Sequence, residues 1–291
     1  MLISEGFKFY CSDKKLLGYS FHTLKSYKIQ CNLLIRYLGD MDISELTPIH
    51  LKQYLLDVSD PEKRIASGKQ PLKPSSIGHR VRFLKSFFRY LHEEGITSKN
   101  LSSKLQEPKL GKRIPKAMTL EEIELIRDAC NSTKEKAIIE FFFSTGIRIG
   151  EARSVNKHDI NWETRSLKIL GKGDKERYIF FSRKCAIWLK KYLTNREDNC
   201  EALFVTQRKP IRRVSVAQLR KYIKDIGKRS ETNVNAYPHR WRHSFATKML
   251  SNDAPMDVIM LHLGHVKIST TMLYAQHTPE KLGQLHDKYF R

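Results

Sequence analysis

The chain has 291 residues, with 53 lysines and arginines against 31 aspartates and glutamates, so its formal net charge at pH 7 is +22. This excess favours a polyanionic partner, above all nucleic acid, because each phosphate neutralised by a cation releases counterions. Five cysteines, an odd number without a Cys-x-x-Cys pair, indicate neither a disulfide framework nor a zinc ribbon, and no apolar run approaches the roughly 20 residues of a membrane span.

Residues 1–106 predict an all-helical module. One helix with a stripe of apolar residues is expected to end at Gly39, and a second to begin at Thr47-Pro48, which combines a capping hydroxyl with a proline in the first turn. A third helix is expected over residues 75–94. The alternation of apolar and polar positions indicates that each helix buries one face.

The third helix also carries a basic stripe. Arg82, Lys85 and Arg89 recur at helical spacing, apart from the apolar face. They are consistent with a solvated surface or with contacts to nucleic-acid phosphates. Residues 107–117 follow, with two prolines, a glycine and several basic residues but no periodicity, so we predict an interdomain linker there.

A second domain is predicted over residues 118–291. It begins with a capping box at Thr119, and a strongly apolar helix over 134–144 then leads to Gly146 and Arg148. An arginine three residues before a glutamate is most often only a surface pair. The local sequence therefore leaves open whether Arg148 forms only a surface ion pair with Glu151.

A β-hairpin is expected next. The runs 166–170 and 177–181 are rich in strand-forming residues, and the turn between them contains Gly171-Lys172-Gly173. Such a turn is equally typical of an exposed loop. A basic helix is then predicted over 215–227, and it supplies, with the preceding loop, the expected DNA contacts Arg212, Arg213, Arg220, Lys221 and Lys224.

The stretch from Pro238 to Thr247 predicts an anion site. On one helix, His239 and Arg242 point the same way, and the arginine offers a planar fork of donors suited to phosphate oxygens. Zinc is the main rival, because His243 stands four residues after His239. No glutamate follows the first histidine and no third ligand is evident, so we expect no metal here.

Tyr274 is the candidate nucleophile. A phenol is only about 0.1% ionised at neutral pH, so it attacks effectively only where cations stabilise the phenoxide. The basic residues upstream would provide them. Tyr237 and Tyr289 are the next candidates.

These pieces together resemble the tyrosine recombinase, or phage integrase, family in its short Xer-like form. The family pattern has counterparts here, in order, at Gly146–Glu151, Gly171–Arg177, His239–Arg242, Leu263-Gly264-His265 and Tyr274. The departures are small: Trp241 stands where a smaller aliphatic residue is common, and Lys267 where a short acid is common.

The resemblance implies a mainly α fold, with an N-terminal helical core-binding domain over 1–106, a basic linker over 107–117 and an α-rich catalytic domain over 118–291 containing a small antiparallel hairpin or sheet. It also implies site-specific DNA recombination through a 3′-phosphotyrosyl intermediate and a Holliday junction, without metal, ATP or another cofactor. The implied catalytic residues are Arg148, Lys172, His239, Arg242, His265 and the nucleophile Tyr274.

The resemblance further implies partners. These are double-stranded DNA recombination sites and a homotetramer, or a heterotetramer with a related recombinase, in which a last helix after Thr278-Pro279 docks on a neighbouring subunit. A cytoplasmic, nucleoid-associated protein without membrane contact is expected, and the short N-terminus favours a Xer-like or resolvase role over phage integration. Two alternatives remain: a type IB topoisomerase-like nicking and closing enzyme, and a non-catalytic sequence-specific DNA-binding protein.

Overall fold

The computed structural model describes residues 1–111, 117–171, 176–231, 235–264 and 287. The chain divides into two compact units, Met1–Lys112 and Arg113–Arg291. Both are rich in helices, and the three-stranded antiparallel sheet that the described residues form belongs to the second unit. The expected mainly α fold with a small antiparallel sheet is therefore confirmed.

Apart from an isolated β-bridge between Leu2 and Asp42, the described secondary structure of the first unit is helical. Its elements are α1 (Ile3–Leu16), α2 (Phe21–Leu38), the short 3-10 turn η1 (Ile43–Glu45), α3 (Pro48–Ser59), α4 (Pro61–Ala66) and α5 (Pro74–Glu93). The predicted end of α2 at Gly39 and the start of α3 at Thr47-Pro48 are confirmed, and the Thr47 side chain accepts a hydrogen bond from the backbone of His50. No predicted helix corresponds to α1 or α4.

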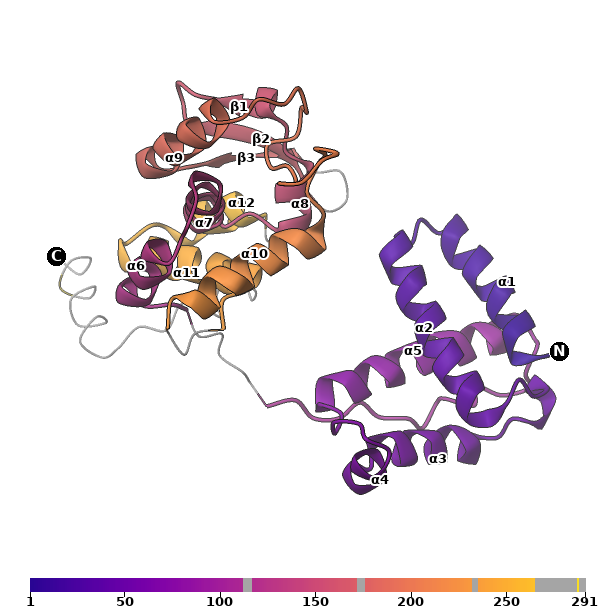
Figure 1. The fold of residues 1–291 in the computed structure, drawn as a ribbon. Coiled ribbons are helices and arrows are strands. Elements are labelled where there is room, and N and C mark those ends of the chain that lie inside the picture. Colours follow the sequence, from indigo (N-terminus) through magenta and orange to yellow (C-terminus); the bar gives the residue numbers. More distant parts are fainter. Residues whose placement is uncertain (112–116, 172–175, 232–234, 265–286, 288–291) are drawn as a thin grey trace. The chain divides into compact units, whose positions relative to one another are not determined.

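Helix α5 forms the centre of the first unit. It packs against α1, α2 and α3, as Figure 1 shows. Its core-facing aromatic side chains include Phe83, Phe87 and Phe88, which are essentially inaccessible to solvent, and Phe7 and Tyr10 of α1 pack on them edge-on. Burial of such large rings, together with the aliphatic side chains of the same core, drives the folding of this unit.

The second unit carries the remaining elements. They are α6 (Leu120–Asp128), α7 (Thr133–Thr145), α8 (Ile149–Ser154), the 3-10 turn η2 (Lys157–Asp159), β1 (Ile160–Asn161), β2 (Ser166–Leu170), β3 (Glu176–Phe180), α9 (Arg183–Thr194), α10 (Val216–Arg229), α11 (Pro238–Ser251) and α12 (Met256–Leu263). Helices α6, α7, α10 and α11 match predicted ones, whereas α9 and α12 have no predicted counterpart.

The second unit is layered around α7. In Figure 1, α7 and α12 lie between the sheet with α9 on one side and α6, α10 and α11 on the other. Ile138, Phe141 and Phe142 of α7 are fully buried, and Phe143 is partly buried against the same core. A helix that is apolar on nearly all sides needs cover on all sides, and these two layers provide it.

The predicted hairpin is present as β2 and β3. The strands pair antiparallel, with Leu167 opposite Ile179 and Leu170 opposite Glu176. Leu167, Ile169 and Ile179 face the core. The pairing of Leu170 with Glu176 therefore places the end of β2 beside the start of β3.

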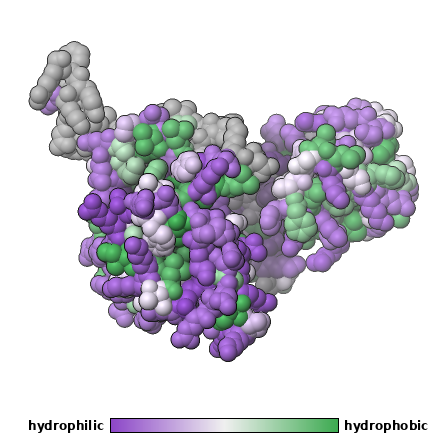
Figure 2. Space-filling model, turned by 90° about the horizontal axis from the view of Figure 1, so that it is seen from above, coloured by the Kyte–Doolittle hydropathy of each residue, from purple (hydrophilic) through white to green (hydrophobic). Residues whose placement is uncertain are grey.

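The surface is predominantly polar. Figure 2 shows hydrophilic residues covering most of the face that it draws, with hydrophobic residues in separate smaller patches. Within the part of the chain that the structure describes, no helix combines the length and apolar character needed to cross a bilayer.

Candidate functional site

The site is organised around the turn between α7 and α8. Helix α7 ends at Gly146, which adopts a left-handed conformation with φ of 57°. A Cβ at this position would lie 2.7 Å from Cδ1 of Phe245 on α11 and 2.9 Å from Cδ2 of Leu263 on α12. Only glycine therefore allows the turn to pack this closely on both helices while adopting this backbone conformation.

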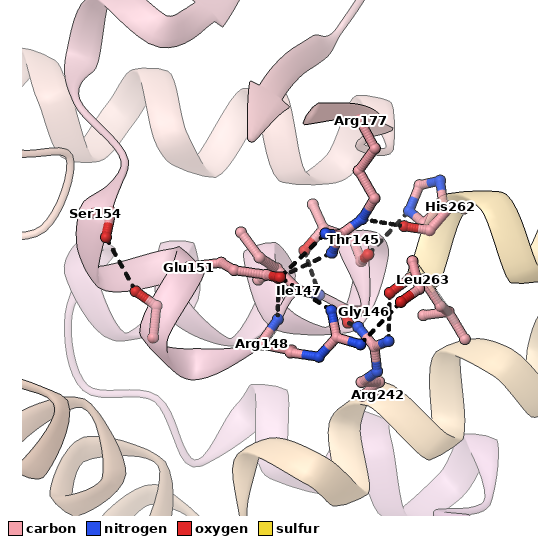
Figure 3. Close-up of polar contacts among 12 residues, drawn as sticks. Thr145, Gly146, Ile147, Arg148, Glu151, Ser154, Arg177, Arg242, His262 and Leu263 are labelled. Atoms are coloured by element: carbon pink, nitrogen blue, oxygen red, sulfur yellow. Dashed lines mark hydrogen bonds and ion pairs between the residues drawn. The ribbon is translucent and has the colours of Figure 1, made fainter. Parts of the chain in front are cut away.

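Arg148 follows this turn and caps α8. Its backbone N–H donates to Oε2 of Glu151 and its Nη1 donates to Oε1, both at 3.0 Å. Arg177 of β3 approaches the same carboxylate from the other side, with Nη1 3.0 Å from Oε1 and Nη2 2.9 Å from Oε2. Figure 3 shows these three side chains together.

The Arg148–Glu151 pair is therefore not an isolated surface contact. The Glu151 side chain is only 8% exposed. Burial alone would raise the pKa of its carboxyl, but hydrogen bonds and charge from Arg177 and Arg148 outweigh it and lower the pKa. Glu151 is thus a buried carboxylate shared by two guanidinium groups.

Arg242 reaches the same place from α11. The helix begins with Pro238 in its first turn, as expected, and Arg242 lies one turn further on, 3% exposed. Its Nη1 donates to the Gly146 carbonyl at 2.8 Å and its Nη2 to the Leu263 carbonyl. Arg242 thereby links the end of α7 to the end of α12.

Three arginines converge on the C-terminal end of α12. The successive carbonyls of His262, Leu263 and Gly264 accept hydrogen bonds from Arg177, Arg242 and Arg148 respectively (Figure 3). The last carbonyls of a helix have no partner within it and carry the negative end of its dipole. The three guanidinium groups donate the missing hydrogen bonds and offset the negative end of the dipole. They also collect positive charge at the point where the chain continues to residue 265.

His239 lies on the exposed side of α11 near these cations. Its pKa is lowered first by desolvation and then by the positive charges of Arg242, Arg148 and Arg220. The imidazole is consequently neutral at pH 7 and able to accept a proton.

His243 stands four residues after His239 and is the second ligand that a zinc site would use. Burial, followed by the charges of His239 and Arg242, lowers its pKa to about 4. In the described ranges, no three His, Cys, Asp or Glu side chains are grouped as a metal site requires.

Three expected site residues, Lys172, His265 and Tyr274, lie outside the described residues, as does the helix expected after Thr278-Pro279. Of the six, the structure brings Arg148 and Arg242 together at the end of α12, with His239 near enough to feel their charge.

The basic stripe of the first unit lines a groove. Arg82, Lys85 and Arg89 of α5 border it together with Tyr19 and Tyr27, around a volume of about 550 Å³. The Nη1 atom of Arg82 forms an ion pair at 2.6 Å with Glu107, in the segment where a linker is predicted. The lining of the groove is mainly cationic, although the carboxylates of Glu93 and Glu107 also border it. Cations of this kind suit phosphate oxygens.

The basic residues around α10 separate into different environments. Arg220 and Lys224 are exposed, and the charge of Arg220 reaches His239. Arg212 and Lys221 are exposed as well, and they line a pocket of about 560 Å³.

Arg213 is engaged within the fold. Its Nη1 donates to the carbonyls of Arg153, Ser154 and Val155, and its Nη2 to Oδ1 of Asn156. These bonds tie the loop before α10 to the end of α8, which accounts for this arginine without a DNA contact.

Arg177 is the site residue that sequence reasoning missed. It shares the inward face of β3 with Ile179, since exposed Glu176, Tyr178 and Phe180 alternate with them. An arginine at a core-facing strand position requires a buried partner. The core-facing position of Arg177 in the strand pattern is the sequence signal that could have identified it.

Comparison with known proteins gives a consistent result. The profile of the phage integrase family matches residues 116–281. Tyrosine recombinase XerC of Haemophilus influenzae strain PittEE is 32% identical over 92% of this chain and 90% of its own length, and XerC of Histophilus somni strain 2336 is 31% identical over 99% and 96%.

Solved structures show the same fold. A lambda integrase dimer bound to a COC′ core site matches with a TM-score of 0.74 at 18% identity, covering 93% of this chain and 97% of that one. A lambda integrase tetramer bound to a Holliday junction matches with a TM-score of 0.74 at 16% identity, covering 96% and 80%. The chain therefore belongs to the phage integrase family and is a tyrosine recombinase.

Proposed function

We propose that this tyrosine recombinase exchanges DNA strands at specific sites by forming a 3′-phosphotyrosyl link through Tyr274. The observation that carries the proposal is the meeting of Arg148 and Arg242 at the carbonyls of Gly264 and Leu263, directly before His265. Segments that are distant in the sequence thereby bring guanidinium groups to one place. Such a cationic site suits the scissile phosphate.

The chemistry is a phosphoryl transfer supported by charge and position. The Tyr274 oxygen attacks phosphorus, the bond from phosphorus to the 5′ oxygen breaks, and the 3′ phosphate remains on the protein. Arg148, Arg242 and His265 bind the non-bridging oxygens in this scheme.

Two further residues move protons. His239 takes the phenol proton, which the lowered pKa of its imidazole permits at neutral pH. Lys172 donates a proton to the departing 5′ oxygen. The bond energy stays in the phosphotyrosyl link, so rejoining with another 5′ hydroxyl requires neither ATP nor a metal ion.

The two units divide the binding of DNA in this proposal. The groove lined by Arg82, Lys85 and Arg89 contacts one stretch of the duplex, and Arg220 and Lys224 contact phosphates beside the catalytic residues. We further propose assembly as a tetramer on two recombination sites, alone or with a related recombinase, as the lambda integrase tetramer on a Holliday junction suggests by its similar fold.

The test begins with wild-type protein and the Tyr274→Phe variant on genomic DNA of the host, in chelator and without ATP. Wild type is expected to form covalent adducts that map to particular sequences, and the variant none. Two labelled duplexes carrying a mapped site should then exchange strands. An adduct formed by Tyr274→Phe would refute the nucleophile, and relaxation of supercoils without strand exchange would refute recombination.

A further inference from the structure

All three guanidinium nitrogens of Arg177 donate hydrogen bonds to two partners within the protein. Its Nη1 and Nη2 bind both oxygens of Glu151, and its Nε donates to the His262 carbonyl at 2.9 Å. The side chain is only 11% exposed. Since every nitrogen points at Glu151 or His262, the group acts on the reaction through other residues.

We propose that Arg177 is a positioning residue for strand cleavage, which offsets the charge of Glu151 so that this carboxylate does not cancel the positive charge of Arg148 at the scissile phosphate. The inference rests on the proposed function, because it assumes that Arg148 binds that phosphate. It adds an arginine outside the six residues to which the family resemblance assigns chemistry.

The charge balance at Glu151 supports this role. With Arg148 alone, the buried carboxylate would form a neutral pair beside the place where an anionic phosphate must bind. Arg177 supplies a second guanidinium group, so the cluster with Glu151 keeps a net positive charge. Between them, the two arginines also direct four hydrogen bonds to the carboxylate, which exhausts its usual capacity.

Arg148 keeps the means to bind a ligand. Its side-chain bonds go from Nη1 to Glu151 and from Nη2 to the Gly264 carbonyl at 3.1 Å, and one third of the side chain is exposed. A guanidinium group has five N–H donors, so donors remain for phosphate oxygens. Its orientation is set by Glu151 on one side and the end of α12 on the other.

The contact with α12 adds a geometric constraint. A Cβ at Gly264 would lie 3.0 Å from Nη1 of Arg177, so the arginine packs directly on the residue that precedes His265. A lysine at position 177 has one nitrogen and could not hold both carboxylate oxygens and the His262 carbonyl in this planar arrangement. Arg177→Lys is therefore expected to be defective.

The experiment measures single-turnover formation of the covalent adduct on a nicked duplex carrying a mapped site. The proteins are wild type, Arg177→Met, Arg177→Lys and the double variant Arg177→Met/Glu151→Gln, with Arg183→Met as a control that removes one exposed arginine of the same unit. Each is assayed on the natural phosphodiester and on a methylphosphonate at the scissile position, which has no negative charge.

On the phosphodiester, Arg177→Met and Arg177→Lys should cleave roughly 10–100-fold more slowly, the usual effect of losing a residue that orients a ligand-binding group. The methylphosphonate should show a much smaller defect, because the charge that Arg148 must stabilise is absent. The double variant also removes the carboxylate that would otherwise cancel the charge of Arg148, so it should recover part of the rate and remain folded even if Arg177→Met does not. Arg183→Met should match wild type.

Wild-type rates for Arg177→Met on the phosphodiester would overturn the inference, and so would equal defects on the two linkages, which indicate a purely structural role. No recovery in a folded double variant would also overturn it. Failure of wild type to form the adduct, or an adduct with Tyr274→Phe, would instead overturn the proposed function.

Discussion

Replacing Gly146 with alanine is expected to destabilise the second unit and to disturb Arg242 at the same time. The residue has a φ of 57°, and a Cβ there would lie 2.7 Å from Phe245 and 2.9 Å from Leu263. Its carbonyl accepts a hydrogen bond from Arg242. Any shift that relieves the clash therefore moves the acceptor of a proposed phosphate-binding residue.

The magnitude follows from two separate costs. A left-handed conformation costs a residue with a Cβ about 1–2 kcal/mol. Overpacking of a filled core adds about 1–3 kcal/mol. The free energy of unfolding of the second unit should therefore fall by about 2–5 kcal/mol.

Tryptophan fluorescence during urea unfolding measures this change in the full-length chain. All three tryptophans, Trp162, Trp188 and Trp241, belong to the second unit, so the signal reports on that unit alone. With a urea dependence of about 2–3 kcal/mol per molar, the midpoint should fall by roughly 1–2 M. Covalent adduct formation should fall in parallel under conditions where the variant is folded.

Gly150→Ala is the matched control. Gly150 is exposed on α8, and apart from its chain neighbours and the backbone of its own helix no heavy atom lies within 4 Å of the position of its Cβ. Alanine there should stabilise the unit by about 0.5–1 kcal/mol, because glycine is a poor helix former. If Gly146→Ala unfolded at the same urea concentration as Gly150→Ala, the packing argument for the turn would be refuted.

Three further predictions concern protonation and charge. In single-turnover pH profiles, the rate of cleavage should fall at acidic pH only below the lowered pKa of His239. His239→Gln should cleave roughly 10²–10⁴-fold more slowly and should no longer show this fall in rate at acidic pH. Burial holds the pKa of His262 at about 4, while the unfolded value is about 6.5, so the unfolded chain binds the extra proton and the contribution of His262 to stability should fall by up to about 3 kcal/mol as the pH drops through this window. His243, whose pKa is also lowered to about 4, acts in the same direction, so His262→Phe should reduce the pH dependence of fluorescence-detected unfolding by the share of one histidine. Arg213→Ala should lower the unfolding midpoint but leave the salt dependence of DNA binding unchanged, because its hydrogen bonds lie within the fold. Lys224→Ala should instead reduce the slope of log affinity against log salt by about 0.9. Equal slopes for the two variants would contradict the assignment of Arg213 to the fold and of Lys224 to DNA.

The sequence alone was informative wherever structure depends on neighbouring residues. The end of α2 at Gly39, the start of α3 at Thr47-Pro48 and the pairing of 166–170 with the following strand all follow from caps, turns and periodicity, which operate over a few residues. The spacing of the motifs from Arg148 onwards likewise identified the family. The helices α4 and α12 have six and eight residues, too few to show a helical period in the sequence, and they were not predicted.

Only the tertiary structure determined which polar groups meet. Glu151 lies 26 residues before Arg177 in the chain, yet the two form a buried bidentate pair, and nothing local to either residue specifies that partner. The carbonyls at the end of α12 gain arginines from β3, α11 and the start of α8 by the same kind of long-range packing. The sequence predicted a cationic site for phosphate, because residue types and spacing are local properties. The fold decided how the charges of Arg148, Arg177 and Glu151 are balanced, because burial and distance are not local.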